Sequence, residues 1–202
     1  MPSPSPLIRP VGFGLAVAFA LVALVLPFLP ESMRLWNYSA FGAVALFAAA
    51  RAGRLGLPLG IALALGGKLA FDMVRYVQQD YHSDYEPSET VYACLAVYGV
   101  LGWLLCRNST NPLRAGAATL ASSAIFFLVT NFVSWQRFDL PYNPGISGLF
   151  ESYWMGLPFW RGTLMSDVLF TAVLFGLDAV AVLAVRSNPV ANESVPIRSE
   201  QS

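Results

Sequence analysis

Long apolar runs with few charges constrain the fold of this chain more than any other feature. Hydrophobic residues make up 56% of the 202 positions and charged residues only 12%, about half the share that is usual in soluble domains. A helix needs about 20 apolar residues to cross the hydrocarbon core of a bilayer. The pattern therefore predicts a multi-pass membrane protein whose main partner is the lipid bilayer.

Six runs approach that length, namely Val11–Leu29, Trp36–Ala50, Leu55–Tyr76, Thr90–Cys106, Leu113–Trp135 and Gly162–Val185. The second run is short for a full crossing, so a re-entrant or tilted helix is an open alternative. A seventh stretch, Ile146–Trp160, is interrupted by Gly156 and Pro158 and fits a short interfacial helix better. We expect an all-α bundle of about six transmembrane helices plus this interfacial helix. It forms one domain over residues 1–186, followed by a disordered cytoplasmic tail over residues 187–202.

Basic residues in short loops indicate which end of the bundle faces the cytoplasm. If the N-terminus is cytoplasmic, that side collects Arg9, Arg51, Arg54, Arg107, Arg114, Arg186 and Arg198. The loop over residues 78–89 then lies outside, with four acidic residues and no Lys or Arg. We therefore expect both termini to be cytoplasmic.

Charged residues within the apolar runs are the strongest functional signal. In "LALGGKLAFDMVRY", Lys68, Asp72 and Arg75 follow one another at helical spacing and share one face. The last run carries Asp167 and Asp178, of which Asp178 has no obvious cation. A charge that faces lipid is unfavourable by about 3 kcal/mol or more. These groups are therefore expected to face the bundle interior. Whether Lys68 and Asp72 pair only with each other remains open at this point.

Polar groups from three runs are expected at a similar depth near the outer surface, where they would form one ligand-binding site. The candidate ligand-binding residues are Asp72, Arg75, Asn131, Trp135, Arg161 and Asp167. Carboxylates suit a cationic or amine group, arginines an anionic group, and aromatic rings an apolar face of a small solute. The expected site thus lies in an outward-facing pocket.

Other kinds of chemistry lack support in the sequence. Cys94 and Cys106 read as small buried apolar residues, and a single histidine, His82, offers no metal site of imidazole type. No nucleotide-binding or hydrolase motif occurs, so we expect no enzyme, no cofactor and no metal. The twelve basic and twelve acidic residues cancel, which gives no reason to expect a nucleic-acid partner.

Two stretches, "NYSAFGAVALFAAA" and "TNFVSWQRFDLPYNPGISGLFESYWMGLPFWRGTLMSDVLFTAVLFG", resemble a family of uncharacterised bacterial membrane proteins known only as a domain of unknown function. The shared motifs fall on Asn131, Phe132 and Trp135, on Tyr142, Pro144 and Gly148, and on Pro158, Phe159, Thr163, Leu164 and Asp167. Departures include Trp160 in place of the usual Phe and an inserted Asn143. The resemblance implies a bacterial inner (cytoplasmic) membrane protein.

The expected layout is also similar to the substrate-binding components of energy-coupling factor vitamin transporters. In those proteins, small residues on a helix face dock a partner membrane subunit. Here Ala45, Ala49 and Gly53 form such a face, which serves either internal packing or a partner membrane subunit.

The leading hypothesis is a membrane protein that binds a small solute in an outward-facing pocket, as the capture subunit of a transporter. The alternative is a structural or assembly membrane protein without a ligand, whose buried charges only fix helix register. A membrane enzyme is a third hypothesis, and it has no supporting motif.

Overall fold

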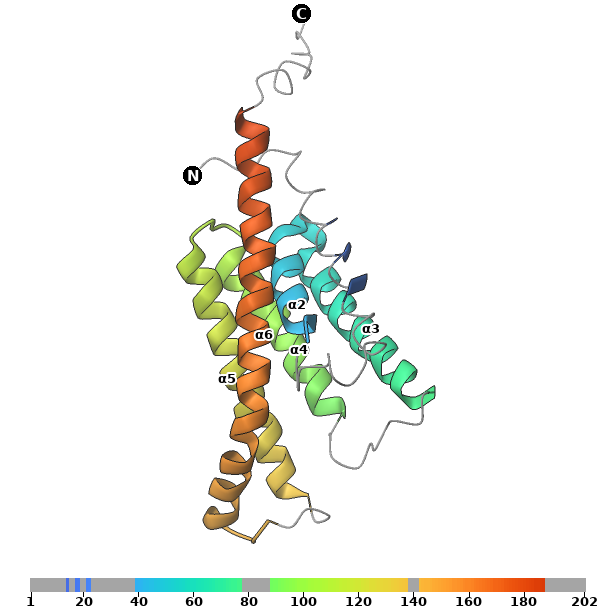
Figure 1. Ribbon diagram of the computed structural model, residues 1–202, viewed down its shortest axis with the longest axis vertical. Coiled ribbons are helices and arrows are strands. Elements are labelled where there is room, and N and C mark those ends of the chain that lie inside the picture. Colours follow the sequence, from blue (N-terminus) through green and yellow to red (C-terminus); the bar gives the residue numbers. More distant parts are fainter. Residues whose placement is uncertain are drawn as a thin grey trace, which may run out of the picture.

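The computed structural model describes residues 39–77, 88–137 and 142–187, together with residues 14, 17, 18, 21 and 22. The elements in order are α2 (Phe41–Arg51), the 3-10 helix η3 (Gly53–Leu55), α3 (Gly56–Val77), α4 (Ser88–Cys106), α5 (Pro112–Gln136) and α6 (Ile146–Ser187). The expectation of an all-α bundle is confirmed for this part of the chain (Figure 1). The first expected span, Val11–Leu29, lies almost entirely outside the described residues, and so does the tail beyond Ser187.

Four of the described helices are long and apolar enough to cross a membrane. They correspond to α3, α4, α5 and α6, and the first three match the expected spans to within a few residues. Asn followed by Pro is a sequence signal for a helix start. Asn111 caps α5 by accepting a 2.9 Å hydrogen bond from the Leu113 amide, and Pro112 lies in its first turn. These four helices indicate a membrane protein. The expected number of six spans is not confirmed by the described residues.

The second expected span is a short helix buried inside the bundle. α2 has 11 residues, so it is about 16 Å long, roughly half of the hydrocarbon core. Every residue from Phe41 to Ala50 is buried, and α2 packs against α3, α4 and α6. A full crossing by Trp36–Ala50 is not confirmed, and over its described residues the alternative of a shorter inserted helix fits better. A helix that is apolar on all sides is stable only in such a central position.

Glycines on the neighbouring helices allow this close packing. A Cβ atom added to Gly60 of α3 would lie 2.5 Å from the Ala45 carbonyl oxygen, and one added to Gly102 of α4 would lie 2.2 Å from the Leu46 carbonyl oxygen. The α2 backbone therefore approaches both helices more closely than any larger residue permits. The Ala49 side chain and the Ala45 carbonyl lie at the contact with Gly60. Both alanines are buried, which supports internal packing over an exposed docking face.

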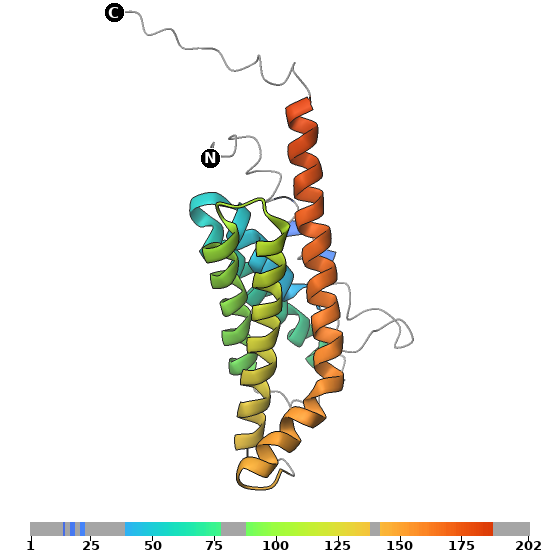
Figure 2. The same ribbon diagram turned by 90° about the vertical axis from the view of Figure 1, so that its left-hand side faces the viewer.

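The stretch Ile146–Trp160 is the first part of α6 and not a separate interfacial helix. α6 runs without interruption over 42 residues with Pro158 inside it. Proline lacks the backbone donor and bends a helix without necessarily ending it, and Figure 2 shows the lower part of α6 leaning beneath α5. Ser152 fixes this lower part by donating a 2.8 Å hydrogen bond to the Asn131 carbonyl of α5.

A partly buried arginine ties three helices together at the opposite end. Nε of Arg51, the last residue of α2, lies 2.7 Å from Oδ2 of Asp178 on α6. Its other nitrogens donate to the carbonyls of Cys106 at 2.8 Å and Ser109 at 3.1 Å, where α4 ends. The Cys106 carbonyl also accepts a 3.2 Å hydrogen bond from the Ser109 amide. The guanidinium thus adds to the hydrogen bonds at the end of α4 and pairs with a buried acid at the same time. The expectation that Asp178 has no cation is wrong, because it did not foresee that α2 ends beside α6.

We predict that Arg51→Met lowers the free energy of unfolding by about 3–5 kcal/mol, because it leaves Asp178 buried without a counter-charge. Arg54→Met, three residues later at an exposed position, is the matched control and should change stability by less than about 0.5 kcal/mol. Thermal unfolding in a mild detergent measures both. Equal losses for the two variants would contradict the role of Arg51.

Candidate functional site

Asp167, near the middle of α6, is the most buried acidic residue that the structure describes. Asp167 is only 3% exposed. The hydroxyl of Tyr98 on α4 donates to its Oδ2 atom, and Ser123 of α5 lies beside both side chains. Three transmembrane helices thus meet at one acidic side chain, which we call the Asp167 centre (Asp167, Tyr98 and Ser123).

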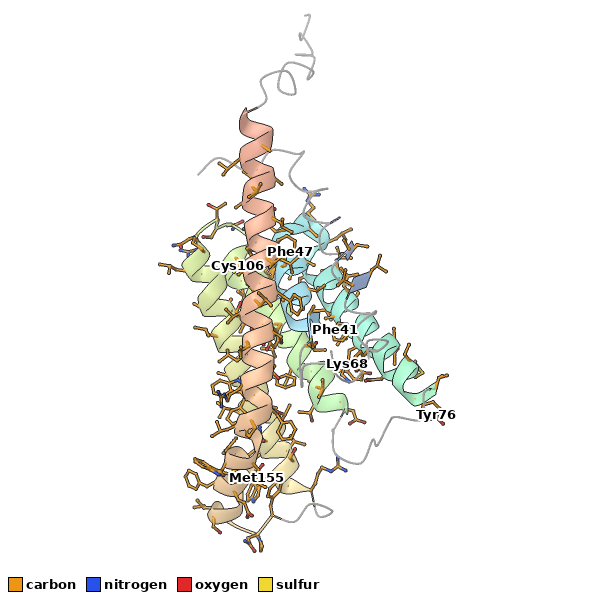
Figure 3. The ribbon with its side chains drawn as sticks, viewed as in Figure 1. Phe41, Phe47, Lys68, Tyr76, Cys106 and Met155 are labelled. Atoms are coloured by element: carbon orange, nitrogen blue, oxygen red, sulfur yellow. The ribbon has the colours of Figure 1, made fainter. Side chains whose placement is uncertain are left out.

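The Asp167 centre lies against the beginning of α2. A Cβ atom added to Gly42 would lie 2.6 Å from Cε1 of Tyr98 and 3.0 Å from Oδ1 of Asp167. Glycine at this position therefore allows the tyrosine and the carboxylate to reach the α2 backbone. The first turn of a helix carries a partial positive charge, equivalent to roughly half an elementary charge, and here it faces an acid. Phe41, which begins α2, lies toward the middle of the molecule on the side of Lys68 (Figure 3).

Further hydroxyl and indole groups extend the Asp167 centre along α5 and α6. Nε1 of Trp160 donates a 3.3 Å hydrogen bond to Ser123 Oγ, and the Trp160 ring stacks on Phe127 at a centroid distance of 4.8 Å. The neighbouring Ser122 hydroxyl is buried without a hydrogen-bond partner. Such a group is unfavourable in an apolar interior by about 1–3 kcal/mol, so it marks a place where a donor or acceptor is missing.

The charge balance separates Asp167 from the other buried acids. Among the residues that the structure describes, Asp72, Asp167 and Asp178 are the buried aspartates. Asp72 pairs with Lys68 and Asp178 with Arg51, whereas no cationic side chain in the described ranges forms an ion pair with Asp167. A hydroxyl group supplies a hydrogen bond but no charge, so Asp167 is the buried aspartate without a side-chain counter-ion among the residues that the structure describes.

A second polar cluster lies between α3 and α4. Nζ of Lys68 is 2.5 Å from Oδ1 of Asp72, and the Tyr92 hydroxyl donates to Oδ2 at 2.9 Å. The Lys68–Asp72 pair is the one that the helical spacing predicted. Tyr92 and Tyr98 are six residues apart on α4, which corresponds to about 9 Å along the helix. Asp72 and Asp167 thus accept hydrogen bonds from two tyrosines of α4 that lie at different depths along this helix.

The structure does not bring the six predicted ligand-binding residues into one site. Asp72 and Asp167 are buried in separate clusters, and no hydrogen bond or ion pair between them is found in the described part of the chain. Asn131 instead donates a 2.8 Å hydrogen bond to the Phe127 carbonyl, Trp135 contacts Phe132 at 5.6 Å between ring centroids, and Arg161 is exposed. The side chain of Arg75 lies outside the described part of the structure.

Sequence reasoning missed Tyr98 and Ser123 as members of the site. Tyr98 is a tyrosine inside an otherwise apolar span, and a buried tyrosine hydroxyl usually finds a partner, so that signal was available. Nothing in the local sequence around Ser123 pairs it with residues on other helices. Within the described residues no group of three His, Cys, Asp or Glu side chains is arranged to hold a metal ion.

Comparison with known proteins places the chain in one family. The match is to the Family of unknown function (DUF6580), over residues 9–190. Because this range covers most of the 202 residues, the chain belongs to that family. No curated protein and no solved structure matches the sequence or the fold.

We predict that Gly42→Ala destabilises the protein by about 1–3 kcal/mol, since the added methyl group forces Tyr98 and Asp167 away from α2. Gly66→Ala is the matched control, because a Cβ at Gly66 would meet no atom within 4 Å and alanine favours a helix by up to about 1 kcal/mol over glycine. Thermal unfolding in detergent compares them. A Gly42→Ala variant as stable as Gly66→Ala would contradict the close packing at the Asp167 centre.

Proposed function

We propose that this protein binds a small solute with a cationic group inside the membrane bundle, with Asp167 as the counter-ion. The single observation that carries the proposal is a buried carboxylate that accepts a hydrogen bond from Tyr98 and forms no ion pair with any cationic side chain in the described ranges. A charge inside a membrane is unfavourable unless it is compensated. A bound cationic group supplies the missing compensation.

The position of Asp167 beside a half-length helix supports the same proposal. Many membrane transporters bind their substrates near the middle of the bilayer, where a helix that does not span ends and leaves backbone groups unpaired. α2 begins inside the bundle and ends at Arg51. Its first turn and Asp167 therefore offer donors and an acceptor at one depth, and the unpartnered Ser122 hydroxyl is nearby on α5.

We further propose that the solute enters from the end of the bundle where α3 ends and α4 begins. The Lys68–Asp72 pair lies between that end and the depth of Tyr98 along α4. In this arrangement the protein acts as the solute-capture subunit of a transporter, with its basic loops on the cytoplasmic side. Because the sequence holds no nucleotide-binding motif, transport would depend on an ion gradient or on a partner ATPase.

A structural role is the second candidate, and the two ion pairs favour it. Lys68–Asp72 and Arg51–Asp178 each neutralise a buried acid, which is how charges act when they only hold helices in register. This candidate leaves Asp167 as a hydrogen-bonded side chain without a ligand. It predicts that no added solute stabilises the protein.

We predict that at least one member of a panel of sodium, potassium, methylammonium, ethanolamine and putrescine raises the unfolding temperature of the purified protein. A ligand at one hundred times its Kd stabilises the folded state by about 2.7 kcal/mol. Asp167→Asn should abolish this shift, because it removes the charge and keeps the shape. Glu151→Gln makes the same kind of change at an exposed position of the same helix and should retain the shift.

Two outcomes would contradict the proposal. If the Asp167→Asn variant keeps the full shift, the solute binds elsewhere. If no member of the panel shifts the unfolding temperature of the wild-type protein, the structural role is the better description.

A further inference from the structure

One end of the bundle carries exposed arginines from two connections of the chain. Arg54 lies in η3, between α2 and α3, whereas Arg107 follows α4 and Arg114 lies in the first turn of α5. All three are exposed. Both connections lie at the end toward which the upper part of α6 runs, in Figure 1 and in Figure 2. We call Arg54, Arg107 and Arg114 the basic end.

Arg51 fixes the two connections next to each other. It lies just before η3, and its guanidinium donates to the carbonyls of Cys106 and Ser109 in the α4–α5 connection. The backbone around Arg54 is thereby tied to the backbone around Arg107. Arg54, Arg107 and Arg114 each lie within a few residues, along the chain, of this anchored contact.

The charge of the basic end is not balanced by the described part of the protein. Asp178 is the buried acid at this end, and it is occupied by Arg51. None of Arg54, Arg107 and Arg114 forms an ion pair with an acidic side chain in the described ranges. Arg114 also lies at the positive end of α5, a position where a cation is unfavourable by roughly 0.3–1 kcal/mol. An anion from outside the chain would relieve both effects.

Apolar residues beside these arginines indicate where that anion resides. Leu55 is 70% exposed and Leu113 is 78% exposed, and they adjoin Arg54 and Arg114 in the sequence. Arg107 lies over the Trp103 ring, 3.8 Å from its centroid. Arginine next to exposed leucine and tryptophan is the composition of a membrane interface, where the aliphatic side chains enter the acyl region and the charges stay among the headgroups.

We propose that the basic end binds the phosphate groups of anionic phospholipids in the leaflet that it faces. Guanidinium groups suit phosphate oxygens because they donate two parallel hydrogen bonds. The long helices α3, α4 and α5 each have one terminus at this level, so the three arginines reach the headgroups together. The leucines distinguish a lipid from a soluble phosphate, since only a lipid covers them. This inference is independent of the solute proposed for Asp167.

The test measures unfolding temperature for the full chain, delipidated in a neutral detergent. Dioleoylphosphatidylglycerol, dioleoylphosphatidylcholine or sodium phosphate is then added at matched concentration. The anionic lipid should raise the unfolding temperature more than the zwitterionic lipid does, and added salt should reduce the difference. Each arginine removed should weaken binding of the anionic lipid about fivefold. Equal shifts with the two lipids, or an equal shift with sodium phosphate, would overturn the proposal.

Variants assign the effect to the basic end. The triple variant R54Q/R107Q/R114Q should lose the preference for the anionic lipid, whereas R54K/R107K/R114K, which keeps the charges, should retain most of it. R161Q removes an exposed arginine about 25 Å along α6 from the level of Asp178 and should behave as wild type. If the triple glutamine variant does not fold, the single variants R54Q, R107Q and R114Q decide. Retention of the full preference in the triple variant, or in all three single variants, would overturn the assignment.

Discussion

The burial of α2 on all sides is the constraint on which the rest of the bundle depends. Inside a membrane every backbone polar group must form a hydrogen bond within the protein. Because α2 has only 11 residues, the backbone groups at both of its ends are subject to this requirement. Glycines of α3 and α4 admit its backbone. Arg51 joins its last turn to α4 and α6, while the Asp167 carboxylate lies beside its first turn. The packing of a small apolar helix thereby positions the charged groups of its neighbours.

This arrangement gives three buried aspartates three different environments. Asp178 meets a guanidinium that also serves a helix end, Asp72 meets a lysine of its own helix, and Asp167 meets the hydroxyl of Tyr98. The difference follows from where α2 lies, because its last residue is a cation whereas its first turn presents backbone donors to Asp167. We therefore propose a ligand-binding role for Asp167, whereas the ion pairs of Asp72 and Asp178 hold neighbouring helices in register. The basic end is a separate consequence of the same anchoring by Arg51.

Features that depend on local spacing could be predicted from the sequence, whereas contacts between distant helices could not. The Asn111 cap, the Lys68–Asp72 pair and the three spans α3 to α5 follow from patterns within one segment. The meeting of Arg51 with Asp178 joins residues 127 positions apart, and that of Tyr98 with Asp167 joins residues 69 apart. The continuity of α6 through Pro158 was also missed, because packing against α5 stabilises a bend that the local sequence alone predicts as a break.

A leucine scan of alanines tests the central position of α2 most directly. Ala43, Ala45, Ala48 and Ala49 are each no more than 1% exposed and lie on different sides of α2, whereas Ala117 and Ala121 on α5 are exposed. Thermal unfolding should show a loss of about 1–3 kcal/mol for each α2 variant and no comparable loss for the two α5 variants. If one side of α2 accepts leucine as readily as α5 does, that side faces lipid, and the helix is not the buried centre of the bundle.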